Sequence, residues 1–332
     1  MSLPEIPDYQ ILSCAYIYIE DHPEVVFWTE DNLCLIAANK CFDLTPKAVE
    51  SSSSGEYTGW IDRELTDEEI AAVYERPTEN TLGLLTNQYA VIKGSNSQEA
   101  VKWDGSSYVR VKIPAIKSKL YGTVKPYQGD VYQQMALDSL STNQVTMLKG
   151  HAGTGKSYLA LGYLFYLLEK GKIDKIIVFA NPVAVGDACQ LGYYPGTKDE
   201  KLLDSQVGNM LVAKVGDRVG VERMIDDGQL ELLAMADIRG FDTTKYGPVA
   251  VYITEAQNFS VNLMKLALQR IGEETIVIID GDYTTQVDRA EYAGSNNGMR
   301  RMSEVFRGHN LYGEVELKNI FRSEIARIAD EM

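Results

Sequence analysis

Histidine and cysteine are scarce in this sequence of 332 residues, which contains three histidines and four cysteines. The cysteines form no CxxC pair and have no nearby histidine partners; they are Cys14, Cys34, Cys41 and Cys189. Because zinc sites need such clustered ligands, a zinc-binding protein is disfavoured. Reduced core thiols are expected instead, which favours a cytoplasmic location.

Long apolar runs and an excess of positive charge are also lacking. No stretch reaches 18 uninterrupted apolar residues, and the N-terminus has no basic segment followed by an apolar one, so neither a membrane span nor a secretion signal is predicted. The formal net charge of -15 disfavours one broad basic surface for nucleic acid, although a local basic groove stays compatible with it. With 45% apolar residues, the chain is long enough for about two globular domains.

Changes in composition divide the chain into three predicted parts. Residues 4–50 show a helical, a strand-like and a second helical pattern, in which Asp8 is expected to cap the first helix. Residues 51–120 open with a Ser-rich break and continue with β-forming segments, where Asp104-Gly105 predicts a hairpin turn. This second part is expected to be a connector with a small antiparallel β module.

Residues 121–332 have a different pattern. The apolar runs "VTML", "KIIVFA", "VAVYIT" and "TIVIID" are separated by helical segments such as "SYLALGYLFYLLEK". Continuous apolar strands that alternate with helices are typical of a parallel sheet covered on both faces. We therefore expect an α/β domain here.

A glycine-rich loop follows the first of these strands. The segment "GHAGTGKS" matches G-x-x-x-x-G-K-[ST] between a predicted strand and a predicted helix, the context that a phosphate-binding loop requires. Its glycines let backbone N–H groups point at phosphate oxygens, Lys156 is predicted to reach the β- and γ-phosphates, and the Ser157 hydroxyl is predicted to bind Mg²⁺. The predicted nucleotide-binding residues of the loop are Gly150, Gly153, Thr154, Gly155, Lys156, Ser157 and Tyr158.

Polar residues at the ends of later strands predict the hydrolytic machinery. In "VYITEAQN", Glu255 is the candidate that polarises the attacking water, whereas Thr254 occupies the position where a first carboxylate is expected. In "IIDGDYTTQVD", Asp282 is predicted to act on magnesium through water and Gln286 to sense the γ-phosphate. Arg322, at a strand-to-helix junction, is a candidate for stabilising phosphoryl-transfer charge.

The order of these motifs carries a family resemblance. "GHAGTGKS", "TEAQN", "GDYTTQVD", "NNGM" and "IFRS" resemble the PhoH-like ATPases, over about residues 121–332. The resemblance implies a P-loop NTPase fold of the RecA and superfamily 1 helicase type, with ATP and Mg²⁺ as cofactors. It also implies that Gln133 reads adenine, and that an aspartate usually stands where this chain has Thr254.

The N-terminal part carries a second resemblance. "DYQILSC" and "VVFWTEDNLCLIAANK" are similar to the later part of the PIN nuclease domain in the two-domain PhoH branch. This implies that Asp8 and Asp31 are remnants of an acidic metal site. The opening strand of that domain is absent, so we expect a PIN domain shortened at its N-terminus.

Two functions remain open at this point. The first is an ATPase that couples hydrolysis to RNA unwinding or remodelling, with single-stranded RNA as a partner and a PIN ribonuclease in the intact protein. It would act as a homo-oligomer such as a ring, with Arg322 or Arg239 reaching across subunits. The second is an ATP-binding switch that hydrolyses weakly because Thr254 lacks a charge. A small-molecule kinase is disfavoured, because these motifs suit water activation better than an acceptor pocket.

Overall fold

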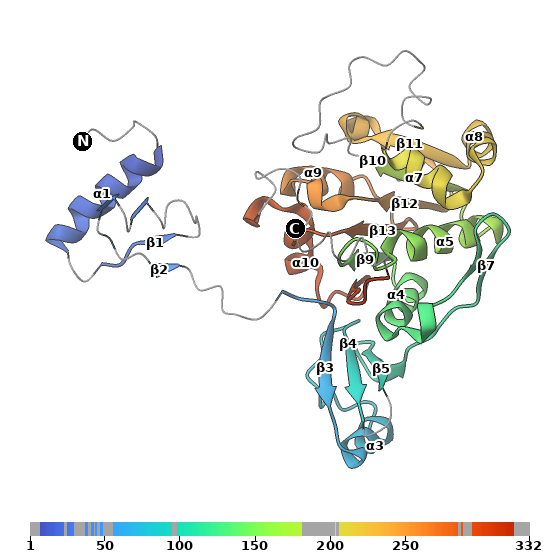
Figure 1. Ribbon diagram of the computed structural model, residues 1–332, viewed down its shortest axis with the longest axis horizontal. Coiled ribbons are helices and arrows are strands. Elements are labelled where there is room, and N and C mark those ends of the chain that lie inside the picture. Colours follow the sequence, from blue (N-terminus) through green and yellow to red (C-terminus); the bar gives the residue numbers. More distant parts are fainter. Residues whose placement is uncertain are drawn as a thin grey trace. The chain divides into compact units, whose positions relative to one another are not determined.

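The computed structural model consists of two compact units, Met1–Glu56 and Tyr57–Met332. The structure describes residues 7–22, 25–29, 37–38, 41–42, 44, 47–48, 56–94, 98–180, 203, 206–284, 287 and 294–321 (Figure 1). No helix in these ranges is both long enough and apolar enough to cross a membrane.

The first unit contains helix α1 (Pro7–Asp21) and a short parallel pair, β1 (Trp28–Thr29) with β2 (Lys47–Ala48). Its small core includes Leu12, Ala38 and Leu44. Helix α1 begins at Pro7, a favoured first position because proline lacks the N–H that would stay unpaired there. Asp8 is therefore the second helical residue, and the expectation that it caps the helix was wrong.

The second unit is built on a six-stranded sheet with the order β11-β10-β12-β13-β9-β14, and all five neighbouring pairs are parallel. The strands are β9 (Val145–Lys149), β10 (Lys175–Ala180), β11 (Leu230–Ala234), β12 (Val249–Ile253), β13 (Ile276–Gly281) and β14 (Tyr312–Glu316). The predicted α/β architecture with a parallel sheet is confirmed. Strand β9, which precedes the glycine-rich loop, lies between β13 and β14. The C-terminal ends of β9, β13 and β12 therefore lie next to one another at one edge of the sheet.

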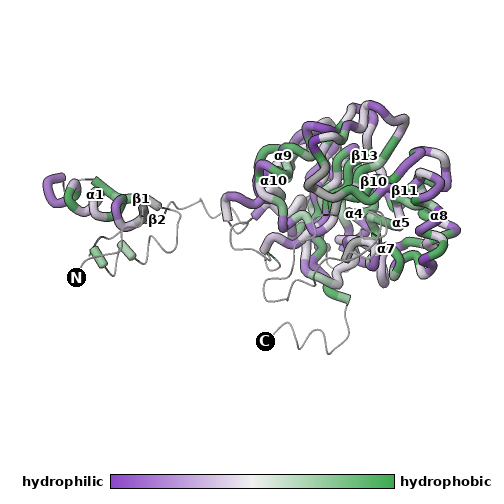
Figure 2. Tube along the Cα trace, turned by 90° about the horizontal axis from the view of Figure 1, so that it is seen from above, coloured by the Kyte–Doolittle hydropathy of each residue, from purple (hydrophilic) through white to green (hydrophobic). Residues whose placement is uncertain are grey.

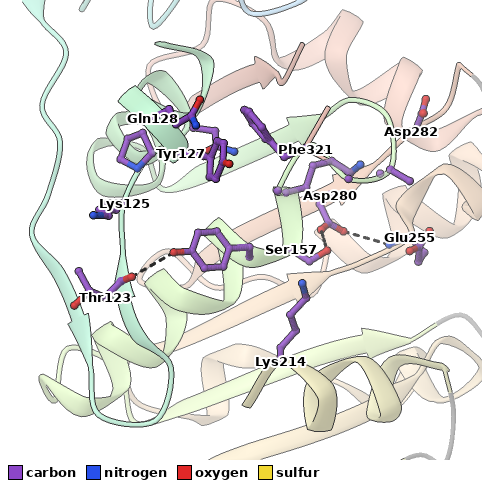
Figure 3. Close-up of a pocket in the computed structure, with 18 residues that line it drawn as sticks. Thr123, Lys125, Tyr127, Gln128, Ser157, Lys214, Glu255, Asp280, Asp282 and Phe321 are labelled. Carbon is purple, nitrogen blue, oxygen red and sulfur yellow. Dashed lines mark hydrogen bonds between the residues drawn. The ribbon is translucent and has the colours of Figure 1, made fainter. Parts of the chain in front are cut away.

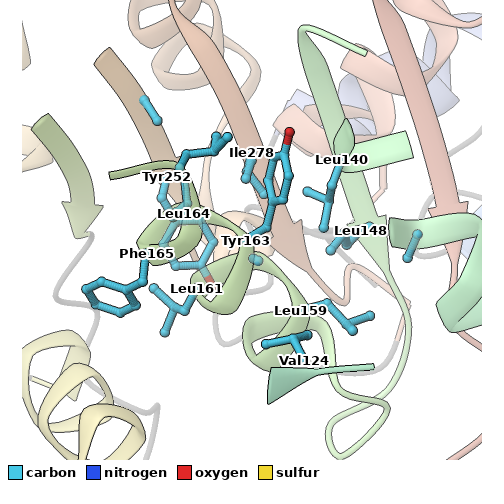
Figure 4. Packing of buried hydrophobic residues seen from close by; sticks show 14 of the residues in the cluster. Val124, Leu140, Leu148, Leu159, Leu161, Tyr163, Leu164, Phe165, Tyr252 and Ile278 are labelled. Atoms are coloured by element: carbon cyan, nitrogen blue, oxygen red, sulfur yellow. The ribbon is translucent and has the colours of Figure 1, made fainter. Parts of the chain in front are cut away.

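Helices cover both faces of this sheet. They are α4 (Val131–Thr142), α5 (Lys156–Glu169), α7 (Gln206–Val215), α8 (Arg218–Asp226), α9 (Val261–Leu268) and α10 (Gly298–Phe306). Side chains alternate along each strand, so Ile278 packs with α4 and α5 on one face (Figure 4). Val277 and Ile279 pack with α9 and α10 on the other face. In Figure 2 apolar strands such as β10 and β13 run through the interior of this unit.

A four-stranded sheet precedes the large one, in the order β3-β4-β5-β6. Its elements are β3 (Trp60–Glu64), helix α3 (Asp67–Glu75), β4 (Tyr89–Lys93), β5 (Gln98–Trp103) and β6 (Tyr108–Arg110), and a hairpin of β7 (Ile116–Ser118) and β8 (Gly122–Val124) follows. The predicted hairpin at Asp104-Gly105 joins the antiparallel strands β5 and β6. Strand β3 pairs with β4 in parallel, which the sequence did not predict.

The four-stranded sheet is part of the same compact unit as the large sheet. Residues just before β3 lie along β14: the Glu316 N–H donates to the Thr58 carbonyl over 2.8 Å, and the Trp60 indole donates to the Glu316 carbonyl over 2.8 Å. The division of the chain at residues 50 and 120 stays a prediction.

Candidate nucleotide-binding site

The loop between β9 and α5 has the backbone shape that its sequence predicts. Gly150, Gly153 and Gly155 adopt φ values of 132°, 87° and 96°, a region that glycine enters without steric cost. Space excludes a side chain as well: a Cβ on Gly150 would lie 2.4 Å from the Leu317 carbonyl oxygen. Helix α5 begins at Lys156, so its first N–H groups and its dipole face the loop.

A cavity of about 630 Å³ opens beside this loop at the C-terminal edge of the large sheet (Figure 3). Its walls come from the loop and the start of α5, the segment before α4, the ends of β12 and β13, and single residues from other elements. The lining residues are Ala152, Gly153, 155–158, Thr123, 125–128, Gln133, Lys214, Glu255, 280–282 and Phe321. The size is within the ordinary range of small-ligand sites. Open parallel sheets bind ligands at this edge.

Three predicted loop residues have polar contacts inside the loop or at its rim. The Lys156 ammonium donates to the Gly150 carbonyl and to the His151 carbonyl, the latter over 3.0 Å. Thr154 is fully buried, and its hydroxyl also donates to the His151 carbonyl. The Tyr158 hydroxyl donates to the Thr123 carbonyl at the cavity wall, over 3.3 Å. These contacts hold the loop in a curled form.

Asp280, at the end of β13, accepts a hydrogen bond from the Ser157 side chain. The Ser157 hydroxyl donates to Asp280 Oδ2 over 2.9 Å, the Tyr252 phenol donates to the same oxygen over 2.7 Å, and the Glu255 N–H donates to Oδ1 over 3.3 Å (Figure 3 draws the contacts of Ser157 and Glu255). Asp280 is 2% exposed and borders the cavity. It was missed in the sequence, although a carboxylate that ends the apolar run "TIVIID" was a usable signal.

Thr254 is buried next to this group, with 1% of its surface exposed. Burial and the Asp280 carboxylate raise the pKa of Tyr252 well above its usual value, against the opposing effect of the Thr254 and Ser157 hydroxyls. The Thr254 oxygen itself has no hydrogen bond of normal geometry. Of the two buried neighbours Thr254 and Asp280, only Asp280, on β13, has a carboxylate.

Glu255 has an unusual backbone. Its φ and ψ of 52° and 38° lie in the left-handed region, which costs a residue with a side chain about 1–3 kcal/mol. The Gln257 amide donates to Glu255 Oε2 over 2.6 Å, and its own oxygen accepts the Asp282 N–H over 3.2 Å. Gln257 is 2% exposed, so it links Glu255 to the end of β13 and fixes its orientation beside the cavity.

Asp282 borders the same cavity but has other partners. His151 Nδ1 lies 3.1 Å from Asp282 Oδ2, while the Thr284 hydroxyl and N–H both donate to Oδ1. Its carboxylate is 2% exposed. Asp282 thus connects the phosphate loop to the turn after β13.

The opposite end of the cavity is aromatic. The rings of Tyr127 and Phe321 have centroids 4.6 Å apart, and 52% and 37% of these residues is exposed. The amide of Gln133 behind them accepts the Tyr127 N–H over 2.8 Å and donates to the Thr154 carbonyl over 3.0 Å. One N–H and one lone pair of that amide are left for further hydrogen bonds. The aromatic pair was not identified from the sequence.

The cavity offers oxygen donors suited to magnesium. Ser157, Glu255, Asp280 and Asp282 all border it, and hydroxyl and carboxylate oxygens are the ligands that this hard cation prefers. In the described part of the chain no cluster of three or more His, Cys, Asp and Glu side chains could hold a metal alone. Mg²⁺ does not require one where substrate phosphates and waters complete its shell.

Several predicted site residues cannot be placed. Gln286, Arg322 and Asp31 lie outside the described residues, and of Asp8 only the backbone is described. Their roles stay predictions. Arg239 lies exposed in a short 3-10 helix, Met235–Gly240, and its action across subunits also stays a prediction.

Comparison with protein families gives one match over more than half of the chain. Residues 126–332 match the family model described as PhoH-like protein. Protein PhoH2 of Bacillus subtilis is 30% identical over 260 residues, 74% of this chain and 56% of its own length. Protein PhoH2 of Thermobispora bispora is 35% identical over 205 residues, 60% of this chain and 45% of its own length. The chain spans about half the length of these curated relatives.

Solved structures give weaker likenesses. Domain III of the Thermotoga maritima replication initiation protein DnaA is 14% identical with a TM-score of 0.28, covering 62% of this chain and 68% of that one. Pif1 helicase from Candida albicans is 18% identical with a TM-score of 0.31, covering 62% of this chain and 42% of that one. TM-scores this low do not support a fold assignment. The assignment rests instead on the strand order and the phosphate loop.

Proposed function

Because the chain belongs to the PhoH-like family, we propose that its Tyr57–Met332 unit binds ATP in the cavity beside residues 150–157 and hydrolyses it. The observation that carries the proposal is that a glycine-shaped loop, Lys156 and the carboxylates of Glu255, Asp280 and Asp282 surround one cavity. Binding alone requires only the loop. Hydrolysis also requires a group that accepts a proton from water.

The triphosphate lies along the loop in this proposal. The first N–H groups of α5 and the Lys156 ammonium neutralise phosphate oxygens, since a helix N-terminus and a lysine both favour anions. Lys214 adds a second positive charge from α7, and its ammonium points toward Ser157 in Figure 3. The adenine lies at the other end, between the aromatic pair and the Gln133 amide.

Glu255 is the proposed general base. Water attacks the γ-phosphorus, the bond between that phosphorus and the bridging oxygen of ADP breaks, and Glu255 accepts the proton of the water. The hydrogen bond from Gln257 holds the carboxylate in place for this step. When bound, Mg²⁺ neutralises charge on the phosphate oxygens, and Ser157 together with a nearby carboxylate would hold it.

The use of the hydrolysis energy is the finer part of the proposal. On the strength of the sequence resemblance, we assign it to RNA unwinding or remodelling by a homo-oligomer that binds single-stranded RNA. The PIN-like interpretation of residues 4–50 belongs to the same proposal. For oligomerisation, light scattering with and without ATP is the test, and a monomer under both conditions would remove the contribution of Arg239 or Arg322 across subunits.

A second function is favoured by one observation, the uncharged and unpaired Thr254 hydroxyl next to the hydrolytic residues. A protein that binds ATP tightly but turns it over slowly would act as a switch. Steady-state ATP hydrolysis, measured with and without single-stranded RNA, separates the two functions. Turnover that RNA stimulates supports the motor; ATP binding with turnover at background supports the switch.

A further inference from the structure

Thr254 and Asp280 occupy equivalent places on neighbouring strands. Strands β12 and β13 are parallel, and their last paired residues are Ile253 and Ile279. Thr254 and Asp280 each follow directly, so they stand side by side at the edge that borders the cavity. Of these two neighbours, the one on β12 is neutral and the one on β13 is a carboxylate.

The carboxylate on β13 contacts the hydroxyl that a P-loop protein uses for its metal. Ser157 donates to Asp280 Oδ2 over 2.9 Å, and Tyr252 donates to the same oxygen over 2.7 Å. Asp280 is 2% exposed, so its rotamer is fixed by packing and by these bonds. By contrast, the Asp282 carboxylate contacts His151 and accepts a hydrogen bond from the Thr284 hydroxyl.

Thr254 has the opposite character. Its hydroxyl is buried at 1% exposure and lacks a hydrogen-bond partner, although such groups are normally paired. A second carboxylate in its place would lie next to Asp280 in a buried setting, where like charges oppose each other's ionisation. A single carboxylate at positions 254 and 280 is therefore electrostatically more favourable than two.

We propose that Asp280 performs the metal-orienting role for which a carboxylate at position 254 would be expected, so that the acid of this site has been exchanged between neighbouring strands. The inference rests on the proposed function. It removes the reason for regarding Thr254 as a defect, because the negative charge is present one strand away. Ser157 and Asp280 together form the protein's side of the magnesium shell.

The test measures how strongly nucleotide binding depends on magnesium, without any turnover. Binding of a fluorescent ATP analogue is titrated in EDTA and over a range of MgCl₂ concentrations, for the parent protein, Asp280→Asn and Asp282→Asn. We expect Asp280→Asn to raise the Mg²⁺ concentration at half-maximal effect about 10–100-fold, whereas the affinity in EDTA should not fall, because loss of a negative charge reduces repulsion of the phosphates. Asp282→Asn should raise it less. Melting curves confirm that each variant is folded.

The exchange variant keeps the test decisive if Asp280→Asn fails to fold. Thr254→Asp combined with Asp280→Thr returns the acid to β12 and should recover most of the magnesium dependence that Asp280→Thr alone loses. Such recovery identifies a coupling between the two positions that loss of packing would not produce.

Two results would overturn the inference while leaving the proposed function intact. One is a folded Asp280→Asn protein whose magnesium dependence equals that of the parent. The other is a larger effect of Asp282→Asn than of Asp280→Asn. A parent protein that binds no ATP analogue in either condition would overturn the inference and the proposed function together.

Discussion

Glu255 combines a left-handed backbone with a fixed carboxylate. Its φ of 52° is unfavourable for a residue with a side chain, and the surrounding bonds from Gln257 and to Asp280 keep it there. Strain that persists at a cavity wall is common at catalytic residues. The strained residue borders the cavity, where the proposed base is needed.

Replacement of Glu255 by glutamine is expected to separate binding from hydrolysis. Glu255→Gln keeps the size of the side chain but removes the base, so steady-state ATP turnover should fall about 10²–10⁴-fold while the affinity for ATP stays close to that of the parent. Glu304→Gln, an exposed change on α10, is the matched control. Turnover that survives in Glu255→Gln would assign the base to another residue.

Lys214 is a further cation at the cavity, beside Lys125 and Lys156, and comes from a helix that no motif indicated. If it meets the phosphates, Lys214→Met removes one charge-assisted hydrogen bond, which is worth about 1.5–3 kcal/mol. ATP affinity measured by calorimetry should then fall about tenfold or more. Lys170→Met, at the C-cap of α5 and outside the cavity lining, serves as the control. Equal affinities for the two variants would exclude Lys214 from the site.

Among the elements, α4 and the four-stranded sheet are joined by a buried ion pair. Lys102 of β5 lies 2.9 Å from Asp138 of α4, with side chains 5% and 2% exposed. The Tyr89 phenol and the Lys112 N–H also donate to the Asp138 carboxylate. Burial, which is the larger cause, and this carboxylate both raise the pKa of Tyr89. One aspartate thus fixes β4, β5 and the chain after β6 against the helix.

Loss of this aspartate should destabilise the unit strongly. Asp138→Asn leaves the Lys102 ammonium buried without its counterion, a change that costs about 3–5 kcal/mol. The double variant Lys102→Met with Asp138→Asn removes the stranded charge and should recover part of that loss. Urea unfolding measures both. If the double variant is no more stable than Asp138→Asn, the charge is not the cause.

The local sequence pattern was sufficient to predict some structural elements and insufficient to predict others. The loop at Gly150–Ser157 and the strands around it were predictable, because a short motif and continuous apolar runs determine them. Strand β3 and its parallel pairing were not, since only long-range contacts to β4 and β14 select them. Asp280 was overlooked because its role depends on Ser157, which lies far from it in sequence and meets it only after the sheet forms.

The hydrophobic core clusters indicate which part of the chain can fold as an independent fragment. The core clusters of Tyr57–Met332 share no residue with the small core of Met1–Glu56. Residues 57–60 also lie along the outer side of β14, which is the last strand of the large sheet. Unpaired strand edges promote association between chains, so these residues protect that edge.

Two fragments test this view. A chain of residues 57–332 should stay in solution, bind ATP like the full protein and melt at the same temperature. A chain of residues 121–332, which retains the whole nucleotide loop but lacks the residues along β14 and the Lys102 partner of Asp138, should aggregate. Sedimentation and calorimetry compare them. A soluble and stable shorter fragment would show that the large sheet is self-sufficient.

Residues after β14 brace the phosphate loop from the other end of the sequence. The Leu317 N–H donates to the Lys149 carbonyl over 2.8 Å, and the Phe321 N–H donates to the Gly153 carbonyl over 2.9 Å. During synthesis the loop leaves the ribosome long before these partners do. A nascent chain that includes Ser157 but not yet Phe321 has an unbraced loop and half of its aromatic pair, so the complete ATP site proposed above forms only after Phe321 has been translated.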